Sequence, residues 1–166
     1  LLIGATASFG LNGKVNADPL PVLEVVELTN NGGDSFPTGY ANKIVYRKDS
    51  VGLYNITYQG LESLLLPCDY CDEPSFHSEG QSVIYLSTAP HSIKSVELDG
   101  TNNYTVLDIG ASIVRPSYSP DGNKIVFATG GNISIFDINT KTITNLAPGT
   151  FPSFNYDSAF NKFRKK

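Results

Sequence analysis

The sequence predicts an all-β fold made of repeated, four-stranded antiparallel sheets. The chain is rich in Tyr, Phe, Gly and Pro, and only 17% of its 166 residues are charged. Aromatic side chains suit a pleated sheet, whereas Gly and Pro mark turns. Short apolar runs are also interrupted by turn signals at short intervals along the chain, which is typical of strands.

The clearest turn signal is Ser119-Pro120-Asp121-Gly122, two residues before the apolar run 125–128. Pro120 presets φ for the second position of a type I turn, and Asp121 suits the third position. Gly122 accepts the left-handed conformation that follows. These residues therefore predict the tight loop of a β-hairpin, with a strand on each side.

This pattern recurs along the chain. Glu79-Gly80 takes the place of Asp121-Gly122 before the apolar residues 83–85, and residues 42–46 nearly repeat residues 123–127. A proline precedes each copy, at positions 37, 74, 116 and 152, with spacings of 37, 42 and 36 residues. That period is close to the length of a propeller blade. In helical repeats of similar period, turn signals would not interrupt the apolar segments so often. The repeat therefore predicts a β-propeller.

Each repeat divides into four short strands. The second strands are expected at 43–46, 82–86 and 124–128, the third at 53–57, 93–98 and 132–138, and the fourth at 61–66, 104–107 and 142–146. After a polar first residue, each second strand is a continuous apolar run, as expected where neighbouring blades cover both faces. We therefore expect three complete blades, at 36–72, 73–114 and 115–150, and the start of a fourth from residue 151.

The two ends of the chain differ from the repeats. Residues 18–35 form a leading segment with an expected outer strand at 23–29, and residues 158–166 form a basic tail. Residues 1–17 are apolar at first and end in Val15-Asn16-Ala17, which is typical of the remnant of a secretory signal peptide. A buried or frayed first strand is the alternative. No apolar run is long enough to span a membrane, so we expect a protein that does not span one.

Charge and motifs exclude several functions. The net charge of −4 argues against a nucleic-acid partner, because phosphate binding needs a clustered basic face. The chain has no G-x-S-x-G, P-loop or G-x-G-x-x-G motif, and its two histidines, His77 and His91, are too few for a histidine-rich catalytic channel. We therefore predict no catalytic residue, no cofactor and no metal.

The pair Cys68 and Cys71 is the one redox-like or metal-like spacing. A zinc site would need a second pair or nearby histidines. In an exported protein a local disulfide in the link between two blades is favoured. Two unpaired thiols remain the alternative.

Residues 116–127 strongly resemble the TolB-like β-propeller repeat, whose usual form is proline, a small residue, an aromatic residue, Ser-Pro-Asp-Gly, a basic residue and an apolar triplet. The resemblance covers roughly residues 28–157, and residues 28–37 look like the usual link between blades. The first copy lacks Ser-Pro-Asp-Gly, and the fourth has Asn155-Tyr156-Asp157-Ser158 at the turn. The fold prediction therefore depends mainly on the third copy of the repeat, which is residues 116–127.

The resemblance implies a larger ring, because propellers of this family usually close with about six or seven blades. The simplest expectation is a part of such a ring. There are two alternatives: a small four-bladed ring, and self-association of two chains through open blade edges. An open array would leave sheet edges and apolar blade faces exposed.

The resemblance also implies a non-catalytic scaffold for protein–protein binding in an exported protein, periplasmic or secreted, whose partner the sequence does not identify. The candidate partner-binding loops join the second and third strands, because loops on a rigid scaffold are common recognition sites. Their residues are Lys48, Asp49, Ala89, Pro90, His91, Gly130 and Gly131. The alternative is the propeller part of a larger enzyme that resembles the prolyl oligopeptidases.

Overall fold

The computed structural model describes residues 28–29 and 33–154. These residues form twelve β-strands and no helix. The predicted signal remnant at 1–17, most of the expected outer strand at 23–29, the fourth turn and the basic tail at 158–166 lie outside the described residues. The strands are β1 (Asp34–Tyr40), β2 (Lys43–Lys48), β3 (Gly52–Thr57), β4 (Glu62–Pro67), β5 (Cys71–Phe76), β6 (Ser82–Thr88), β7 (His91–Glu97), β8 (Tyr104–Leu107), β9 (Val114–Tyr118), β10 (Lys124–Thr129), β11 (Asn132–Asp137) and β12 (Thr142–Pro148).

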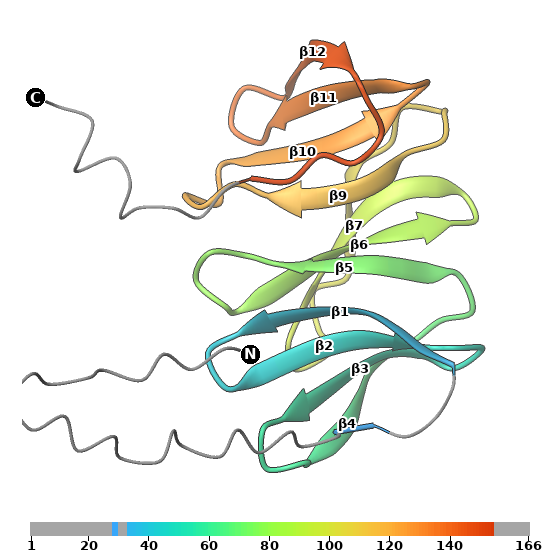
Figure 1. Cartoon of the computed structure of the whole chain (residues 1–166), viewed down its shortest axis with the longest axis vertical. Coiled ribbons are helices and arrows are strands. Elements are labelled where there is room, and N and C mark those ends of the chain that lie inside the picture. The colour runs from blue at the N-terminus through green and yellow to red at the C-terminus, as the bar shows by residue number, and fades with distance from the viewer. Residues whose placement is uncertain (1–27, 30–32, 155–166) are drawn as a thin grey trace, which may run out of the picture.

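The strands form three separate sheets, each with its four strands in chain order. We call β1 to β4 blade 1, β5 to β8 blade 2 and β9 to β12 blade 3. Neighbouring strands in every blade are antiparallel, and the blades stack face to face (Figure 1). The first strand of each blade contacts the first strand of the next, β1 on β5 and β5 on β9. The prediction of an all-β propeller with four-stranded antiparallel blades is therefore confirmed.

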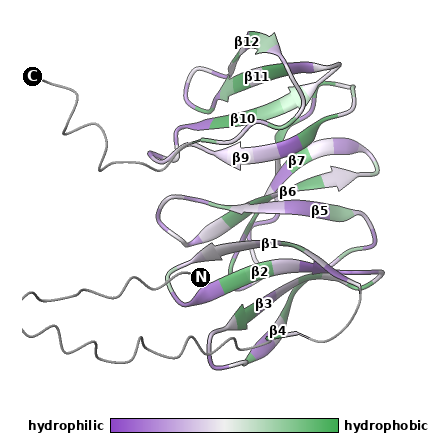
Figure 2. Ribbon diagram, in the orientation of Figure 1, coloured by the Kyte–Doolittle hydropathy of each residue, from purple (hydrophilic) through white to green (hydrophobic). Residues whose placement is uncertain are grey.

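Two apolar clusters lie between the blades. One joins blades 1 and 2 and includes Val45, Leu53, Val83 and Val96, and the other joins blades 2 and 3 and includes Ile84, Ile93, Ile125, Phe127 and Phe136. Much of β2, β10 and β11 is coloured as hydrophobic in Figure 2. Along β6, successive residues enter the two clusters alternately, because neighbouring side chains of a strand point to opposite faces. Both faces of blade 2 are thus covered, which explains the continuous apolar run in its second strand.

The hairpin between β9 and β10 forms where the sequence predicts it. The amide of Gly122 donates to the carbonyl of Ser119 at 2.9 Å, and the amide of Ser119 donates to the carbonyl of Lys124 at 2.9 Å. Gly122 has a φ of 71°, in the left-handed region. The side chain of Asp121 accepts hydrogen bonds from the Ser119 hydroxyl and the Asn123 amide, which fixes the turn.

The turns also connect neighbouring blades. A side-chain carbon added at Gly80 would overlap the ring of Tyr40, and one added at Gly122 would overlap the ring of His77. The His77 ring lies edge-on to Tyr118, with the ring centroids 4.9 Å apart. In both places, therefore, the ring at the end of one blade's first strand packs on the turn glycine of the next blade.

The strand boundaries differ in detail from those expected. The first strands begin at Asp34, Cys71 and Val114, slightly before the expected blade starts at 36, 73 and 115. The third strands β7 and β11 each end one residue earlier than expected, at Glu97 and Asp137. The division of the chain into blades at residues 36, 73 and 115 stays a prediction.

Candidate functional site

Four residues that directly precede the repeat prolines form the candidate site. Phe36, Glu73 and Arg115 lie in the first strands β1, β5 and β9, and Phe151 follows β12. We call these four residues the pre-proline cluster. Because the first strands of successive blades contact one another, equivalent residues from separate repeats come together here. The described chain after β12 returns toward β9 and brings Phe151 to the same place (Figure 1).

The backbone of the first strands aims these side chains. Phe36, Glu73 and Arg115 have φ values of 52°, 47° and 56°, in the left-handed region. Each also lies at an interruption of strand register, which marks a β-bulge. The following proline disfavours the right-handed helical conformation at these positions. A bulge redirects a side chain out of the regular alternation, so the same local geometry presents one side chain per blade.

Arg115 connects the members of the cluster. Its Nε lies 3.3 Å from Oε1 of Glu73, and its backbone amide donates to Oε2 of Glu73 at 2.5 Å. Its guanidinium carbon lies 4.9 Å from the ring centroid of Phe151 and 5.9 Å from that of Phe36. Both separations allow cation–π attraction.

The cluster leaves part of its surface open to solvent. The Arg115 side chain is 44% exposed, whereas its partner Glu73 is only 14% exposed. A cavity of about 200 Å³ lies among Phe36, Glu73, Arg115, their prolines, Ser117 and Pro152. An accessible guanidinium beside aromatic rings and proline edges can bind a carboxylate or a carbonyl oxygen together with apolar groups. This arrangement suits recognition of a polypeptide.

The first predicted partner-binding residues, Lys48 and Asp49, lie at the end of β2 and in the turn after it. Lys48 Nζ is 2.9 Å from Glu62 Oε1 and 4.6 Å from the ring centroid of Tyr54. Hydrogen bonding to Glu62 raises the pKa of Lys48. Asp49 pairs with Arg47 at 3.2 Å. Both side chains therefore already have partners within blade 1.

The other predicted loop residues lie in very short turns. Ala89 and Pro90 alone separate β6 from β7, with a cis peptide bond between them, and His91 is already the first residue of β7. Gly130 and Gly131 alone separate β10 from β11. The second-to-third turns lie along one edge of the stack (Figure 1), but none of the seven predicted residues lines the cavity of the pre-proline cluster. Their role in partner binding stays a prediction.

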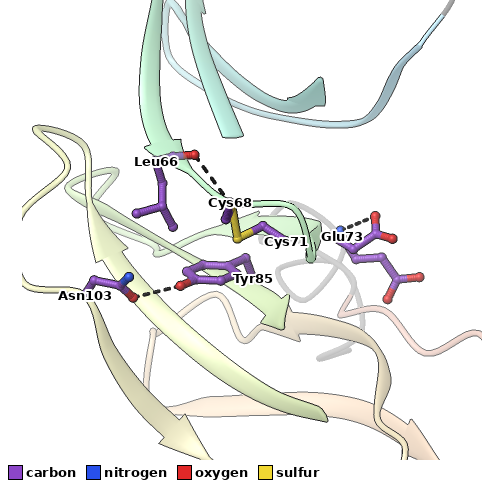
Figure 3. Close-up of a disulfide and its surroundings, with 7 residues drawn as sticks. Leu66, Cys68, Cys71, Glu73, Tyr85 and Asn103 are labelled. Carbon is purple, nitrogen blue, oxygen red and sulfur yellow. Dashed lines mark hydrogen bonds between the residues drawn. A yellow bond between two sulfur atoms is a disulfide. The ribbon is translucent and has the colours of Figure 1, made fainter. Parts of the chain in front are cut away.

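The two cysteines lie in the link from β4 to β5 and form a disulfide, with 2.03 Å between the sulfurs. Figure 3 shows this bond beside Leu66 and Tyr85. The amide of Cys68 donates to the carbonyl of Val51, and the amide of Thr88 donates to the carbonyl of Tyr70. The disulfide loop is therefore tied to a turn of blade 1 and to the end of β6 in blade 2.

Other chemistry has no support in the described part of the chain. No group of three or more His, Cys, Asp or Glu side chains there could hold a metal ion. Residues 28–29 and 33–154 also contain no helix long and apolar enough to cross a membrane. These findings concern only the residues that the structure describes.

The sequence contained a signal for the pre-proline cluster. The repeated prolines were visible, but the residues before them are Phe, Glu, Arg and Phe, which share no chemistry. Their common feature is a backbone conformation, and the spacing of the prolines identified the position without indicating that side chains would meet there.

Comparison with known proteins supports the fold. No protein-family model and no curated protein sequence matches the chain. Among solved structures, a TolB-like protein from Agrobacterium tumefaciens is 19% identical to this chain, with a TM-score of 0.66. The match covers 76% of this chain and 56% of the Agrobacterium protein. TolB from Acinetobacter baumannii is 20% identical with a TM-score of 0.60, and covers 68% of this chain and 32% of its own.

An enzyme is also among the similar structures. Acylaminoacyl peptidase from Pyrococcus horikoshii is 11% identical with a TM-score of 0.56, and covers 72% of this chain and 25% of its own. This chain spans about half the length of the first TolB structure and about a third of the second. At these identities the similarity shows the propeller fold alone.

Proposed function

We propose that this chain, whose blades have the β-propeller fold seen in TolB, is a non-catalytic scaffold that binds a protein partner at the pre-proline cluster. The observation that carries this proposal is the exposed guanidinium of Arg115, held by Glu73 and the ring of Phe151 at the edge of a cavity. Binding surfaces are enriched in Arg and aromatic residues. The first strands hold these side chains rigidly, so little conformational entropy is lost when a partner binds.

The cluster favours a partner segment with an acidic side chain beside an apolar one. The carboxylate would pair with Arg115, and the apolar group would lie on Phe151, which is 76% exposed. Glu73 keeps the guanidinium in position but is too enclosed to dominate the surface. The resemblance to TolB further supports an exported protein, periplasmic or secreted.

Random peptides displayed on phage provide a test that needs no known partner. We expect the wild-type chain to select peptides with an acidic residue next to an apolar one, and Arg115→Ala to weaken their binding at least about tenfold, or about 1.4 kcal/mol. Lys141→Ala is the matched control, because Lys141 is an exposed cation outside the cluster. Selected peptides that bind Arg115→Ala as tightly as the wild type would contradict the proposed site.

The alternative function is the propeller part of a larger hydrolase. The observation that favours it is the similarity to the acylaminoacyl peptidase. A fluorophosphonate probe, which labels active serine hydrolases, distinguishes the two. We expect no labelling of the native protein isolated from its source. Labelling would place this chain within an enzyme.

A further inference from the structure

A cavity of about 430 Å³ lies between blades 2 and 3 and shares no lining residue with the pre-proline cluster. We call it the inter-blade groove. Its walls come from the turn between β5 and β6, from β8, from the end of β9 with its turn, and from the turn between β11 and β12. Its volume falls in the range of small-ligand pockets. Both walls belong to neighbouring blades, so the described residues form the groove by themselves.

The turn between β5 and β6 leaves its carboxylate unpaired. This turn has the same backbone hydrogen bonds as the turn between β9 and β10. There, Asp121 accepts hydrogen bonds from the Ser119 hydroxyl and the Asn123 amide. The equivalent residue Glu79 is longer, and its own amide donates instead to Nδ1 of His77 at 3.3 Å. Within the described structure, the Glu79 carboxylate has no hydrogen-bond or ion-pair partner. It can therefore bind a ligand in the groove.

The next two positions of this turn differ in the same way. In blade 3, the Asn123 side chain bonds to the turn after β11 at 3.3 Å, and Lys124 Nζ pairs with Asp137 at 2.5 Å. The equivalent residues of blade 2 are Gln81 and Ser82, which both line the groove. Neither side chain has a hydrogen-bond partner among the described residues. The small Ser82 also leaves space where blade 3 has a lysine.

Aromatic and aliphatic side chains form the apolar part of the groove. Tyr104 in β8 lines it and is 58% exposed. Tyr118 is buried in the wall, edge-on to the His77 ring. Val106 and Ile138 also line the groove. An exposed tyrosine offers a ligand both an apolar ring face and a polar hydroxyl.

The charges in the groove favour a neutral ligand. Glu79 supplies a carboxylate, and Lys141 supplies an ammonium group that lies 5.8 Å from the ring centroid of Phe136. An anionic ligand would be repelled by Glu79, and a cationic one by Lys141. The carboxylate accepts hydrogen bonds, the ammonium donates them, and the Gln81 amide and Thr105 hydroxyl do both. A neutral sugar satisfies all of these groups, because each of its hydroxyls donates and accepts and its C–H faces are apolar.

We propose that the inter-blade groove binds a neutral saccharide. A sugar ring lies on Tyr104, and its hydroxyls bond to Glu79, Gln81 and Lys141. This proposal does not rest on the polypeptide site at the pre-proline cluster. The two sites share no residue, so one molecule can hold both ligands at once.

An array of immobilised glycans tests this proposal. It carries neutral oligosaccharides of hexoses, pentoses and N-acetylhexosamines beside sialylated and sulfated glycans. We expect the chain to bind neutral glycans in preference to charged ones. Titration calorimetry with a selected neutral oligosaccharide should then show that Tyr104→Ala and Gln81→Ala each weaken binding at least about tenfold.

Matched controls lie outside the groove. Tyr70 is 59% exposed, Gln59 is exposed, and neither lines the groove. Tyr70→Ala and Gln59→Ala should therefore bind the oligosaccharide like the wild type. Arg115→Ala should also bind it normally while losing affinity for peptides, which distinguishes failure of this site from failure of the pre-proline cluster.

Gln81→Ala is the decisive variant, because Gln81 is exposed in a turn and the change should leave the fold intact, as circular dichroism can check. A wild-type chain that binds no neutral glycan, or that prefers charged glycans, would overturn the proposal. Folded Gln81→Ala and Tyr104→Ala chains that bind the oligosaccharide as tightly as the wild type would overturn it as well.

Discussion

Gly80 and Gly122 combine two requirements at one residue. Both have a positive φ, at 67° and 71°, and both lie against a ring from the preceding blade. The turn alone explains the positive φ, but Asn or Asp would also tolerate that conformation. Only the contact with the ring of the preceding blade demands that the side chain be absent. These glycines therefore serve the stacking of blades as well as the hairpin.

Replacing Gly122 by Ala should separate these two roles. We expect a loss of about 2–3 kcal/mol, because the left-handed Ala costs about 1 kcal/mol and the new methyl group displaces His77 from Tyr118. Gly130→Ala is the matched control, since Gly130 has a φ of 55° with nothing near the added carbon. It should cost only about 1 kcal/mol.

Urea denaturation measures both changes. Adding His77→Ala to Gly122→Ala should recover part of the loss, because the overlapping ring is then absent. Equal losses for Gly122→Ala and Gly130→Ala would show that the contact between the blades contributes nothing.

Asp121 should make the hairpin sensitive to acid. Hydrogen bonds from the Ser119 hydroxyl and the Asn123 amide lower its pKa to about 2. A pKa that is depressed in the folded state stabilises the fold at neutral pH, and that contribution disappears as the pH falls from about 4 toward 2. Asp121→Asn should therefore lower the melting temperature at pH 7 more than at pH 2. A difference from the wild type that is the same at both pH values would contradict this assignment.

At the scale of elements, the link between β4 and β5 connects two blades. The disulfide between Cys68 and Cys71 closes a short loop, with a sequence separation of 3 residues. Backbone hydrogen bonds connect this loop to the turn before β3 and to the end of β6. So short a loop gains less from cross-linking than a long one, because less chain entropy is removed from the unfolded state.

Replacing both cysteines by serine should lower the free energy of unfolding by about 2 kcal/mol. The measurement is guanidinium denaturation of the double variant beside the wild type, with and without reductant. Reductant should destabilise the wild type to a similar extent and leave the variant unchanged. A variant as stable as the wild type would mean that the backbone hydrogen bonds of Cys68 and Thr88 hold the link without the disulfide.

The sequence predicted the elements well where local chemistry determines them. The apolar second strands and the Ser-Pro-Asp-Gly turn depend on patterning and turn propensity, and both form as expected. Local chemistry did not indicate that Ala89-Pro90 and Gly130-Gly131 would be turns of only two residues, with His91 already in a strand. The pre-proline cluster was missed because its residues meet only after the blades stack, so contacts between repeats, rather than any local pattern, create it.

At the scale of the whole molecule, the three blades form a one-dimensional array. The two apolar clusters lie between adjacent blades, and blade 2 contributes to both of them. Stability should then be a sum of blade terms and contact terms between neighbours. A defect in one contact is expected to loosen the end blade before it affects the rest.

Phe127→Ala provides the test of this expectation. Phe127 is fully buried in the cluster between blades 2 and 3, and truncating such a side chain costs about 3–5 kcal/mol. We expect hydrogen exchange followed by mass spectrometry to show lost protection in β9 to β12, with β1 to β4 nearly unchanged. Phe127 reaches only one of the two clusters, so the contact between blades 1 and 2 stays intact. Loss of protection spread evenly over all three sheets would mean instead that the blades unfold as one cooperative unit.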